Sequence, residues 1–425
     1  MVALSVGKKR ELGAFLSMLA KTIGGVGLVV ILMSCGGTSP GYTYTVGGTV
    51  SGLAGSGLVL QINGGDDKSI SADGYFTFAT PLTDGDSYNI TVKSPGPVNP
   101  TQTCRVVSNG TGTIISAPLY NVEVSCMTSP TSIAFSVESG HEFAHVANEN
   151  SNILTYLINP DGTFDTGTAT TATAGTFPTS IAVNPSGQFA YVANTSDGTI
   201  SAYTINSSGG ELNSTCGISP LCPSTGKYPT AVTVDPSGQF VYLANMGDNT
   251  ISAYSIGSTG ALTAIGNPNT IGTGTSPAFI TVDPSKQFAY VANEGSNSIS
   301  IYTIDPTYGT LAASTTSIPT VTVGNNPTSV VTVLVGSSEF AYVTNTSDST
   351  ISAYSIDLSN GGALNAIIGS PFNAGTSAGT LAYPTSIAID PSGHFAYAIN
   401  AGDVSIWAYP INQSTGALGT PSGPL

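Results

Sequence analysis

One short motif in the chain has the form of a zinc-protease signature. The segment His141-Glu142-Phe143-Ala144-His145 reads H-E-x-x-H, and that pattern holds zinc when a helix places both histidines on one face, one turn apart. The surrounding residues alternate as in a strand, where positions four apart lie about 13 Å from each other. One ion cannot bridge that separation, so we expect no metal here. We interpret His145 as a replacement for a tyrosine that recurs elsewhere in the chain.

A second group of residues with chemical potential is acidic. One carboxylate follows the second predicted strand in each copy of an internal repeat, and all of these turns should emerge on the same side of the molecule. They would form an acidic face able to bind Ca²⁺ or a cationic partner; we expect no other cofactor. The alternative is hairpin chemistry, because aspartate and its neighbours favour tight turns. The six residues are Glu149, Asp197, Asp248, Glu294, Asp348 and Asp403.

The five cysteines indicate an exported protein. After one candidate lipid site, Cys35, four remain, and an even number in an oxidising compartment favours disulfides. Two local pairs, Cys104 with Cys126 and Cys216 with Cys222, are the simplest assignment. A zinc site built from these four thiolates is the alternative, although its ligands would come from two separate domains at no recognised spacing.

The first 34 residues have the pattern of a targeting segment. Basic residues Lys8 to Arg10 precede the apolar run Ile23 to Met33, which is too short to span a bilayer stably. The ending Leu32-Met33-Ser34-Cys35 resembles a bacterial lipobox. That resemblance implies lipid attachment at Cys35 and, because Gly36 rather than aspartate follows, an outer-membrane or cell-surface destination. An ordinary signal peptide or an uncleaved anchor is the alternative.

Composition excludes one class of partner. Only 8% of the 425 residues are charged and the net charge is −15; four of the nine cations lie within the first 21 residues. Binding to nucleic acid requires a basic surface, and the rest of this chain has too few cations to form one.

The remaining chain divides into a tether over 35–42, a module over 43–127 and a repeat region over 128–425. The module alternates in β fashion with Gly/Asp/Asn turns between six strand candidates, which predicts a small β-sandwich. Its opening, Gly48 to Leu53, resembles immunoglobulin-like or prealbumin-like modules of bacterial surface proteins. We expect this module to act as a spacer.

The repeat region consists of copies of about 50 residues. Each copy has four short β segments, with an Asn/Asp-Pro-Ser-Gly turn after the first in several copies. Four strands in a unit of this length predict a β-propeller blade. We therefore expect an all-β chain whose propeller has six blades, or seven with one incomplete. The copies open at Pro130, Pro178, Pro229, Pro277, Pro327 and Pro384.

The second strand of each copy carries a family resemblance. Phe189-Ala-Tyr-Val-Ala-Asn194 and Tyr342-Val-Thr-Asn345 are similar to YVTN-type repeats and to the lactonase-like propellers. The resemblance implies a propeller fold and raises the prospect of lactone hydrolysis. A 6-phosphogluconolactone substrate would need cations for its phosphate, and the repeat region has no Arg and only Lys227 and Lys286.

From these features we predict a non-catalytic binding or display scaffold at the bacterial cell envelope. The partner would be an envelope protein or a glycan, the membrane contact a lipid anchor, and the chain a monomer. The alternative is a lactonase-like hydrolase that opens an uncharged lactone with a carboxylate base, for which the sequence assigns no catalytic residue. Any local function should lie where the copies disagree, as in the loops Leu212 to Lys227 and Ile367 to Tyr383.

Overall fold

The structure is a computed structural model, and it describes residues 42–53, 57–93, 102–128, 130–149, 151–215, 223–266, 269–314, 320–375 and 381–424. The predicted signal peptide, Cys35, Cys216 and Cys222 lie outside these residues. Within them every regular element is a strand apart from two single-turn 3₁₀ helices, η1 (Glu294–Ser296) and η2 (Leu358–Asn360). None of the described segments forms a helix long and apolar enough to cross a membrane.

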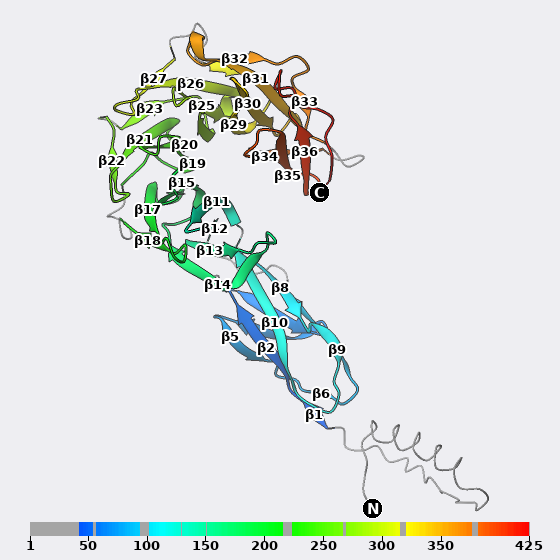
Figure 1. Cartoon of the computed structure of the whole chain (residues 1–425). Coiled ribbons are helices and arrows are strands. Elements are labelled where there is room, and N and C mark those ends of the chain that lie inside the picture. Colours follow the sequence, from blue (N-terminus) through cyan, green and yellow to red (C-terminus); the bar gives the residue numbers. More distant parts are fainter. Residues whose placement is uncertain are drawn as a thin grey trace, which may run out of the picture.

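The N-terminal module is a sandwich of two four-stranded sheets (Figure 1). A short pair, β1 (Thr43–Tyr44) and β6 (Leu82–Thr83), accompanies them. The first sheet has the order β5 (Gly74–Thr77), β2 (Val46–Ser51), β10 (Leu119–Thr128) and β8 (Gln102–Ser108). The second has the order β4 (Gly65–Ile70), β3 (Leu58–Ile62), β7 (Ser87–Val92) and β9 (Thr111–Thr113).

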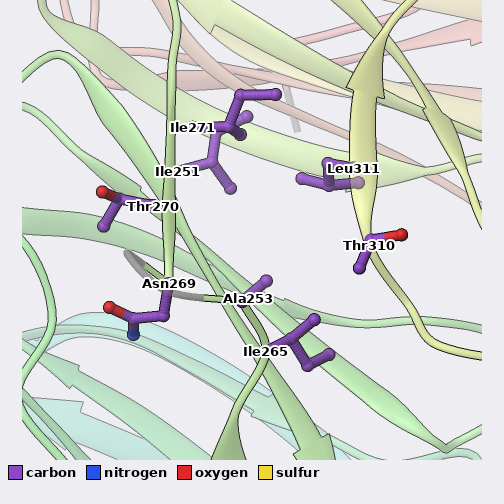
Figure 2. A pocket seen from close by; sticks show the side chains of 9 residues that line it. Ile251, Ala253, Ile265, Asn269, Thr270, Ile271, Thr310 and Leu311 are labelled. Carbon is purple, nitrogen blue, oxygen red and sulfur yellow. The ribbon is translucent and has the colours of Figure 1, made fainter.

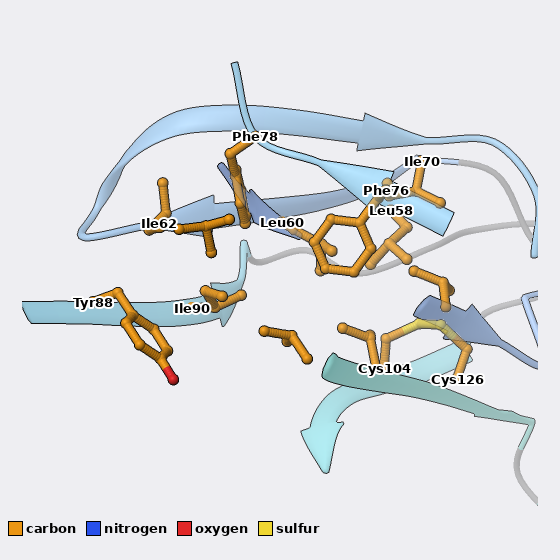
Figure 3. Packing of buried hydrophobic residues seen from close by; sticks show 14 of the residues in the cluster. Leu58, Leu60, Ile62, Ile70, Phe76, Phe78, Tyr88, Ile90, Cys104 and Cys126 are labelled. Atoms are coloured by element: carbon orange, nitrogen blue, oxygen red, sulfur yellow. A yellow bond between two sulfur atoms is a disulfide. The ribbon is translucent and has the colours of Figure 1, made fainter. Parts of the chain in front are cut away.

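Strand alternation builds the core of this sandwich. Leu58, Leu60 and Ile62 of β3 all point inward and are buried, as expected for a strand with one face on the core. Cys104 and Cys126 are directly paired across β8 and β10 and form a disulfide within the same core (Figure 3). Because β10 ends at Thr128 and the first propeller strand begins at Pro130, the disulfide lies close to the junction between the two parts.

The propeller consists of six antiparallel sheets in chain order, which follow one another around an arc from green to red in Figure 1. Blade 1 contains β11 (Pro130–Glu138), β12 (His141–Asn148), β13 (Asn152–Ile158) and β14 (Phe164–Thr173). Blade 2 contains β15 (Pro178–Val183), β16 (Phe189–Asn194), β17 (Thr199–Ile205) and β18 (Leu212–Ser214). Blade 3 contains β19 (Pro229–Val234), β20 (Phe240–Asn245), β21 (Thr250–Ile256), β22 (Leu262–Ala264) and β23 (Thr270–Gly272).

The last three blades repeat this order. Blade 4 contains β24 (Pro277–Val282), β25 (Phe288–Asn293), β26 (Ser298–Ile304), β27 (Leu311–Ala313) and β28 (Thr320–Thr322). Blade 5 contains β29 (Pro327–Val335), β30 (Ser338–Asn345), β31 (Thr350–Asp357), β32 (Ala363–Ala366) and β33 (Phe372–Asn373). Blade 6 contains β34 (Pro384–Ile389), β35 (Phe395–Asn400) and β36 (Ser405–Pro410), with β-bridges to Leu418 and Ser422 outside β36.

The Asp-Pro-Ser-Gly turns fasten the first strand of a blade to the second. In blade 3, Asp235 Oδ1 accepts hydrogen bonds from the backbone N–H groups of Gln239 and Phe240, at 2.9 and 2.8 Å. Asp283 makes the same pair of bonds in blade 4, where the turn reads Asp-Pro-Ser-Lys. Both carboxylates are almost fully buried, so these bonds offset the loss of their contact with water.

Successive blades are joined by one recurring contact, which we call the tyrosine–glycine contact. A tyrosine in the second strand of one blade donates its hydroxyl hydrogen to a glycine carbonyl in the last turn of the next blade. A phenylalanine two residues earlier covers the same glycine; on Gly309, a Cβ atom would lie 2.2 Å from the ring of Phe240. Only glycine fits there, because the position also has a positive φ. The four hydroxyl bonds run from Tyr191 to Gly260, Tyr242 to Gly309, Tyr290 to Gly362 and Tyr342 to Gly416, at 2.7–3.1 Å.

Candidate functional site

Three of the six turn acids predicted to form an acidic face bond to a neighbouring loop. In blades 2, 3 and 5 the carboxylate accepts a hydrogen bond from a backbone N–H of the loop that leads into the first strand of its own blade. Asp197 bonds to Thr176, Asp248 to Lys227 and Asp348 to Asn325. Each of these three carboxylates therefore has a hydrogen-bond partner within its own blade.

The other three acids lie in equivalent turns. Glu294 Oε1 accepts a hydrogen bond from the Asn326 amide, Asp403 accepts one from the Ser405 hydroxyl, and Glu149 is half-buried. In the described part of the chain, no three histidine, cysteine, aspartate or glutamate side chains gather closely enough to hold a metal ion.

The H-E-x-x-H segment lies on strand β12, as the repeat alignment predicts. His145 is fully buried, with Nε2 2.9 Å from Ser136 Oγ and Nδ1 2.9 Å from Thr155 Oγ1. Burial lowers the pKa of His145 to about 4, so the imidazole is neutral and has a structural role. His145 occupies the position of the recurring tyrosine, and both of its bonds stay inside blade 1.

This replacement interrupts the series of tyrosine–glycine contacts at one place. Phe143 still covers Gly210 of blade 2, but no tyrosine hydroxyl of the described residues reaches that glycine. Beside it lies a cavity of about 240 Å³ between blades 1 and 2. Its lining residues are His141, Phe143, Thr155, Leu157, Thr168, Thr170, Ser208, Gly209 and Glu211.

Two residues of this cavity depart from the repeat and can exchange protons. His141 takes a position that is glycine in blades 2, 3 and 6, and Glu211 takes one that is alanine in blades 3, 5 and 6. Glu211 Oε2 is buried and has no hydrogen-bond partner, which is costly for a carboxylate and indicates a site that water or a ligand completes. Imidazole, carboxylate and hydroxyl groups in one cavity are the components of general acid–base catalysis.

Sequence reasoning missed this pair. It treated His141 only as half of a zinc motif and did not single out Glu211. The available signal was that both residues break the repeat, and Glu211 directly precedes Leu212, where one of the uneven loops was expected to hold function. What the sequence does not show is that the turn holding Glu211 packs against the preceding blade.

A second unusual group is a buried acid pair between blades 4 and 5. Glu339 is only 5% exposed and its Oε2 has no hydrogen-bond partner, while Asp283 is fully buried. Burial, together with the nearby Asp283 charge, raises the pKa of Glu339 to about 7. Neither the cavity between blades 1 and 2 nor the one between blades 3 and 4 includes this pair, and we assign it to packing.

A smaller cavity of about 110 Å³ lies between blades 3 and 4 (Figure 2). Ile251, Ile271 and Leu311 supply aliphatic walls, and Asn269 and Thr270 supply polar groups. It contains no titratable side chain, so it lacks the groups that acid–base chemistry needs.

The chain is similar to known proteins both in sequence and in fold. The family model described as "Lactonase, 7-bladed beta-propeller" matches residues 116–219 and 150–332. A search of curated proteins finds no match. Among solved structures, the periplasmic gluconolactonase of Pseudomonas aeruginosa superposes with a TM-score of 0.54 at 18% identity, covering 80% of this chain and 93% of that one.

A provisionally named 6-phosphogluconolactonase from Bacteroides uniformis also superposes with a TM-score of 0.54. Its identity to this chain is 18%, and the superposition covers 85% of this chain and 94% of the other. At such identities the two structures establish a shared fold.

Proposed function

Because the chain belongs to the lactonase family of seven-bladed β-propellers, we propose that it hydrolyses an uncharged lactone in the cavity between blades 1 and 2. The observation that carries the proposal is that His141 and the unpartnered carboxylate oxygen of Glu211 line one cavity, at the junction where the tyrosine is replaced. The presence of both residues in one cavity and the match to the lactonase family favour a hydrolase over the non-catalytic scaffold predicted from the sequence.

The cavity contains the groups that lactone opening requires. His141 would take a proton from a water molecule while the water oxygen attacks the lactone carbonyl carbon. Thr170 and Ser208 line the same space, and their hydroxyl groups would donate hydrogen bonds to the carbonyl oxygen as it gains negative charge. The ring C–O bond then breaks, and the proton passes from His141 to the leaving oxygen, which gives a hydroxy acid.

Glu211 and the surrounding charge indicate which substrates fit. A carboxylate with an unfilled buried oxygen would accept a hydrogen bond from a substrate hydroxyl, as a sugar-derived lactone carries. It would also repel a phosphate, and neither Lys227 nor Lys286 lines the cavity to compensate. We therefore propose a neutral polyhydroxy lactone rather than a phosphorylated one.

The cellular location of the protein is a second proposal. We propose that the chain is exported and anchored at the outer membrane or cell surface through lipid on Cys35. Incorporation of a labelled fatty acid into the wild-type chain, and none into Cys35→Ser, is the expected result.

Variants that restore the repeat residue test the site with little risk to folding. We expect His141→Gly and Glu211→Ala each to lower kcat/KM for δ-gluconolactone by about 100-fold with little change in Tm. His394→Gln is the matched control, because it changes the exposed histidine of blade 6 to the residue that blades 2, 3 and 4 carry there. A wild-type rate equal to spontaneous hydrolysis across a panel of uncharged lactones would contradict the proposal.

A further inference from the structure

Two exposed aromatic side chains lie on neighbouring blades at one end of the propeller. Phe177 directly precedes strand β15 of blade 2 and is 38% exposed, and Tyr228 directly precedes β19 of blade 3 and is 57% exposed. We call these two residues the aromatic pair. The inner strands β15 and β19 pack on each other (Figure 1). Blades 1 and 4 flank them, so the exposure of the pair does not depend on the space between blades 6 and 1.

The backbone at both residues has a conformation that bulky side chains avoid. The angle φ is +57° at Phe177 and +52° at Tyr228, in the left-handed region where a residue of this size is an outlier. Ser276 and Asn326 hold the same position in blades 4 and 5, with φ of +52° and +59°, so the fold itself does not require an aromatic ring there. Strain of this kind is concentrated at functional sites, which makes the aromatic pair a candidate for binding.

One residue, Thr195, holds the two aromatic positions relative to each other. Its backbone N–H donates to the Phe177 carbonyl at 3.0 Å, and its hydroxyl donates to the carbonyl of Pro229 at 2.6 Å, directly after Tyr228. The Tyr228 ring also packs on Gly247, where a Cβ atom would lie 2.6 Å from the ring. The aromatic pair is therefore fixed on the backbone, and the rest of its surface faces solvent.

Carboxylates lie beside both rings. Asp197 and Asp248 each accept a hydrogen bond from the backbone N–H of the residue just before the aromatic one, Thr176 and Lys227 respectively. Both aspartates are exposed, and a carboxylate can accept several hydrogen bonds at once. Lys227 adds an ammonium group 3.9 Å from Asp248 Oδ1. Groups that accept and donate hydrogen bonds thus border the rings.

This combination matches the chemistry of a sugar ring. A pyranose has a face of C–H groups that packs on an aromatic ring, and it has hydroxyl groups at its edge that bond to carboxylates and ammonium groups. Asp197 and Asp248 would repel an anionic polymer. The only other cation of the repeat region, Lys286, lies in the turn between β24 and β25, at the other end of the blades.

A cationic polymer would gain less from this surface than a neutral one. Both aspartates already accept backbone hydrogen bonds, and Asp248 already has Lys227 as an ionic partner. The rings are therefore the main contact that the surface offers, and they bind a neutral sugar without a charge on the ligand.

We propose that the aromatic pair, together with Asp197 and Asp248, is a binding site for a neutral polysaccharide. It lies at the opposite end of blade 2 from the turn that holds Glu211, because that turn follows the third strand, β17. Binding at this site would hold the protein on a glycan surface. The proposal goes beyond lactone hydrolysis and does not depend on it.

The experiment measures retardation of the intact chain in native gels that contain hydroxyethyl cellulose, galactomannan or dextran. We expect at least one of these polymers to retard the wild type, and we expect Phe177→Asn/Tyr228→Asn to raise the dissociation constant by at least about 10-fold. The double variant should keep or raise the wild-type Tm, because asparagine adopts the left-handed conformation readily and blade 5 carries it there. The matched control is Tyr308→Asn, which removes a 69% exposed tyrosine from the turn between β26 and β27, at the other end of the blades, and should bind as the wild type does.

Three results would overturn the proposal. Unretarded migration of the wild type in all three gels would show that the surface does not bind a neutral polysaccharide. Equal dissociation constants for the wild type and the double variant would place the binding elsewhere on the chain. Retardation by polylysine and by none of the neutral polymers would assign the surface to a cationic partner.

Discussion

His145 explains why one blade junction differs from the others. The imidazole is shorter than a tyrosine and bonds within its own blade to Ser136 and Thr155. In blades 2, 3 and 5 the tyrosine is paired across the sheet with alanine, whereas His145 is paired with Thr155. Both members of this cross-strand pair, His145 and Thr155, therefore differ from the repeat at the junction where we propose the site.

Reversing both changes should close the cavity. We expect His145→Tyr/Thr155→Ala to fold with an unchanged or higher Tm, because the tyrosine hydroxyl gains the Gly210 carbonyl as a partner. Hydrolysis of δ-gluconolactone should fall by at least about 100-fold. The measurement is kcat/KM beside a thermal melt, with Thr155→Ala as the control that keeps the cavity open. Undiminished hydrolysis by the folded double variant would place the reaction elsewhere.

Glu339 should make stability depend on pH. Its pKa is raised from the ordinary 4.5 to about 7 in the folded chain, so between these values the folded state binds more protons than the unfolded state. The contribution of Glu339 to the free energy of unfolding should therefore be complete below about pH 4.5 and should be lost as pH rises through 7. We expect a lower Tm at pH 8 than at pH 5, with a contribution on the order of 1 kcal/mol or more.

The variant Glu339→Gln isolates this effect. It should flatten the fall in Tm between pH 5 and pH 8, because the amide stays neutral at every pH. Glu123→Gln, on the exposed surface of the sandwich, should leave the profile as in the wild type. An identical pH profile for Glu339→Gln and the wild type would show that Glu339 is ionised in the folded chain.

At the scale of elements, the blades follow from local patterns. Proline at the start of each first strand, Asx-Pro-Ser-Gly turns and period-2 alternation predict the strands because these signals act over a few residues. The contacts between blades are different, since each tyrosine bonds to a glycine 67 to 74 residues further along the chain. His141 and Glu211 are separated by a similar number of residues. Counting repeats therefore locates both positions but does not show that they line the same cavity.

The last-turn glycines should therefore be the least tolerant positions of the propeller. Gly309 has φ of +67° and its Cβ would lie 2.2 Å from the Phe240 ring, so Gly309→Ala should lower stability by roughly 2 kcal/mol or more. Gly272→Ala is the matched control, because nothing lies within 4 Å of its Cβ position. Equal denaturation midpoints for the two variants in urea would show that the contact does not hold the blades together.

At the scale of the whole molecule, a disulfide-stapled sandwich leads directly into an arc of six blades whose regular contacts stop at two places. One is the blade 1–2 junction, where the tyrosine is missing and a cavity with proton-exchanging groups takes its place. The other is the open end between blades 6 and 1 of the described residues, where β34 and β11 do not pack on each other as the other inner strands do. The regular junctions account for folding, and the blade 1–2 junction carries the proposal for catalysis.

The most direct test is the hydrolysis of one neutral lactone by the intact chain and by the double revertant His141→Gly/Glu211→Ala. Initial rates of δ-gluconolactone opening are measured at neutral pH and corrected for spontaneous hydrolysis. We predict a wild-type rate well above that background and a loss of at least about 100-fold in kcat/KM in the double revertant, with the melting profile retained. Equal kcat/KM values for the two proteins would contradict the assignment of the site.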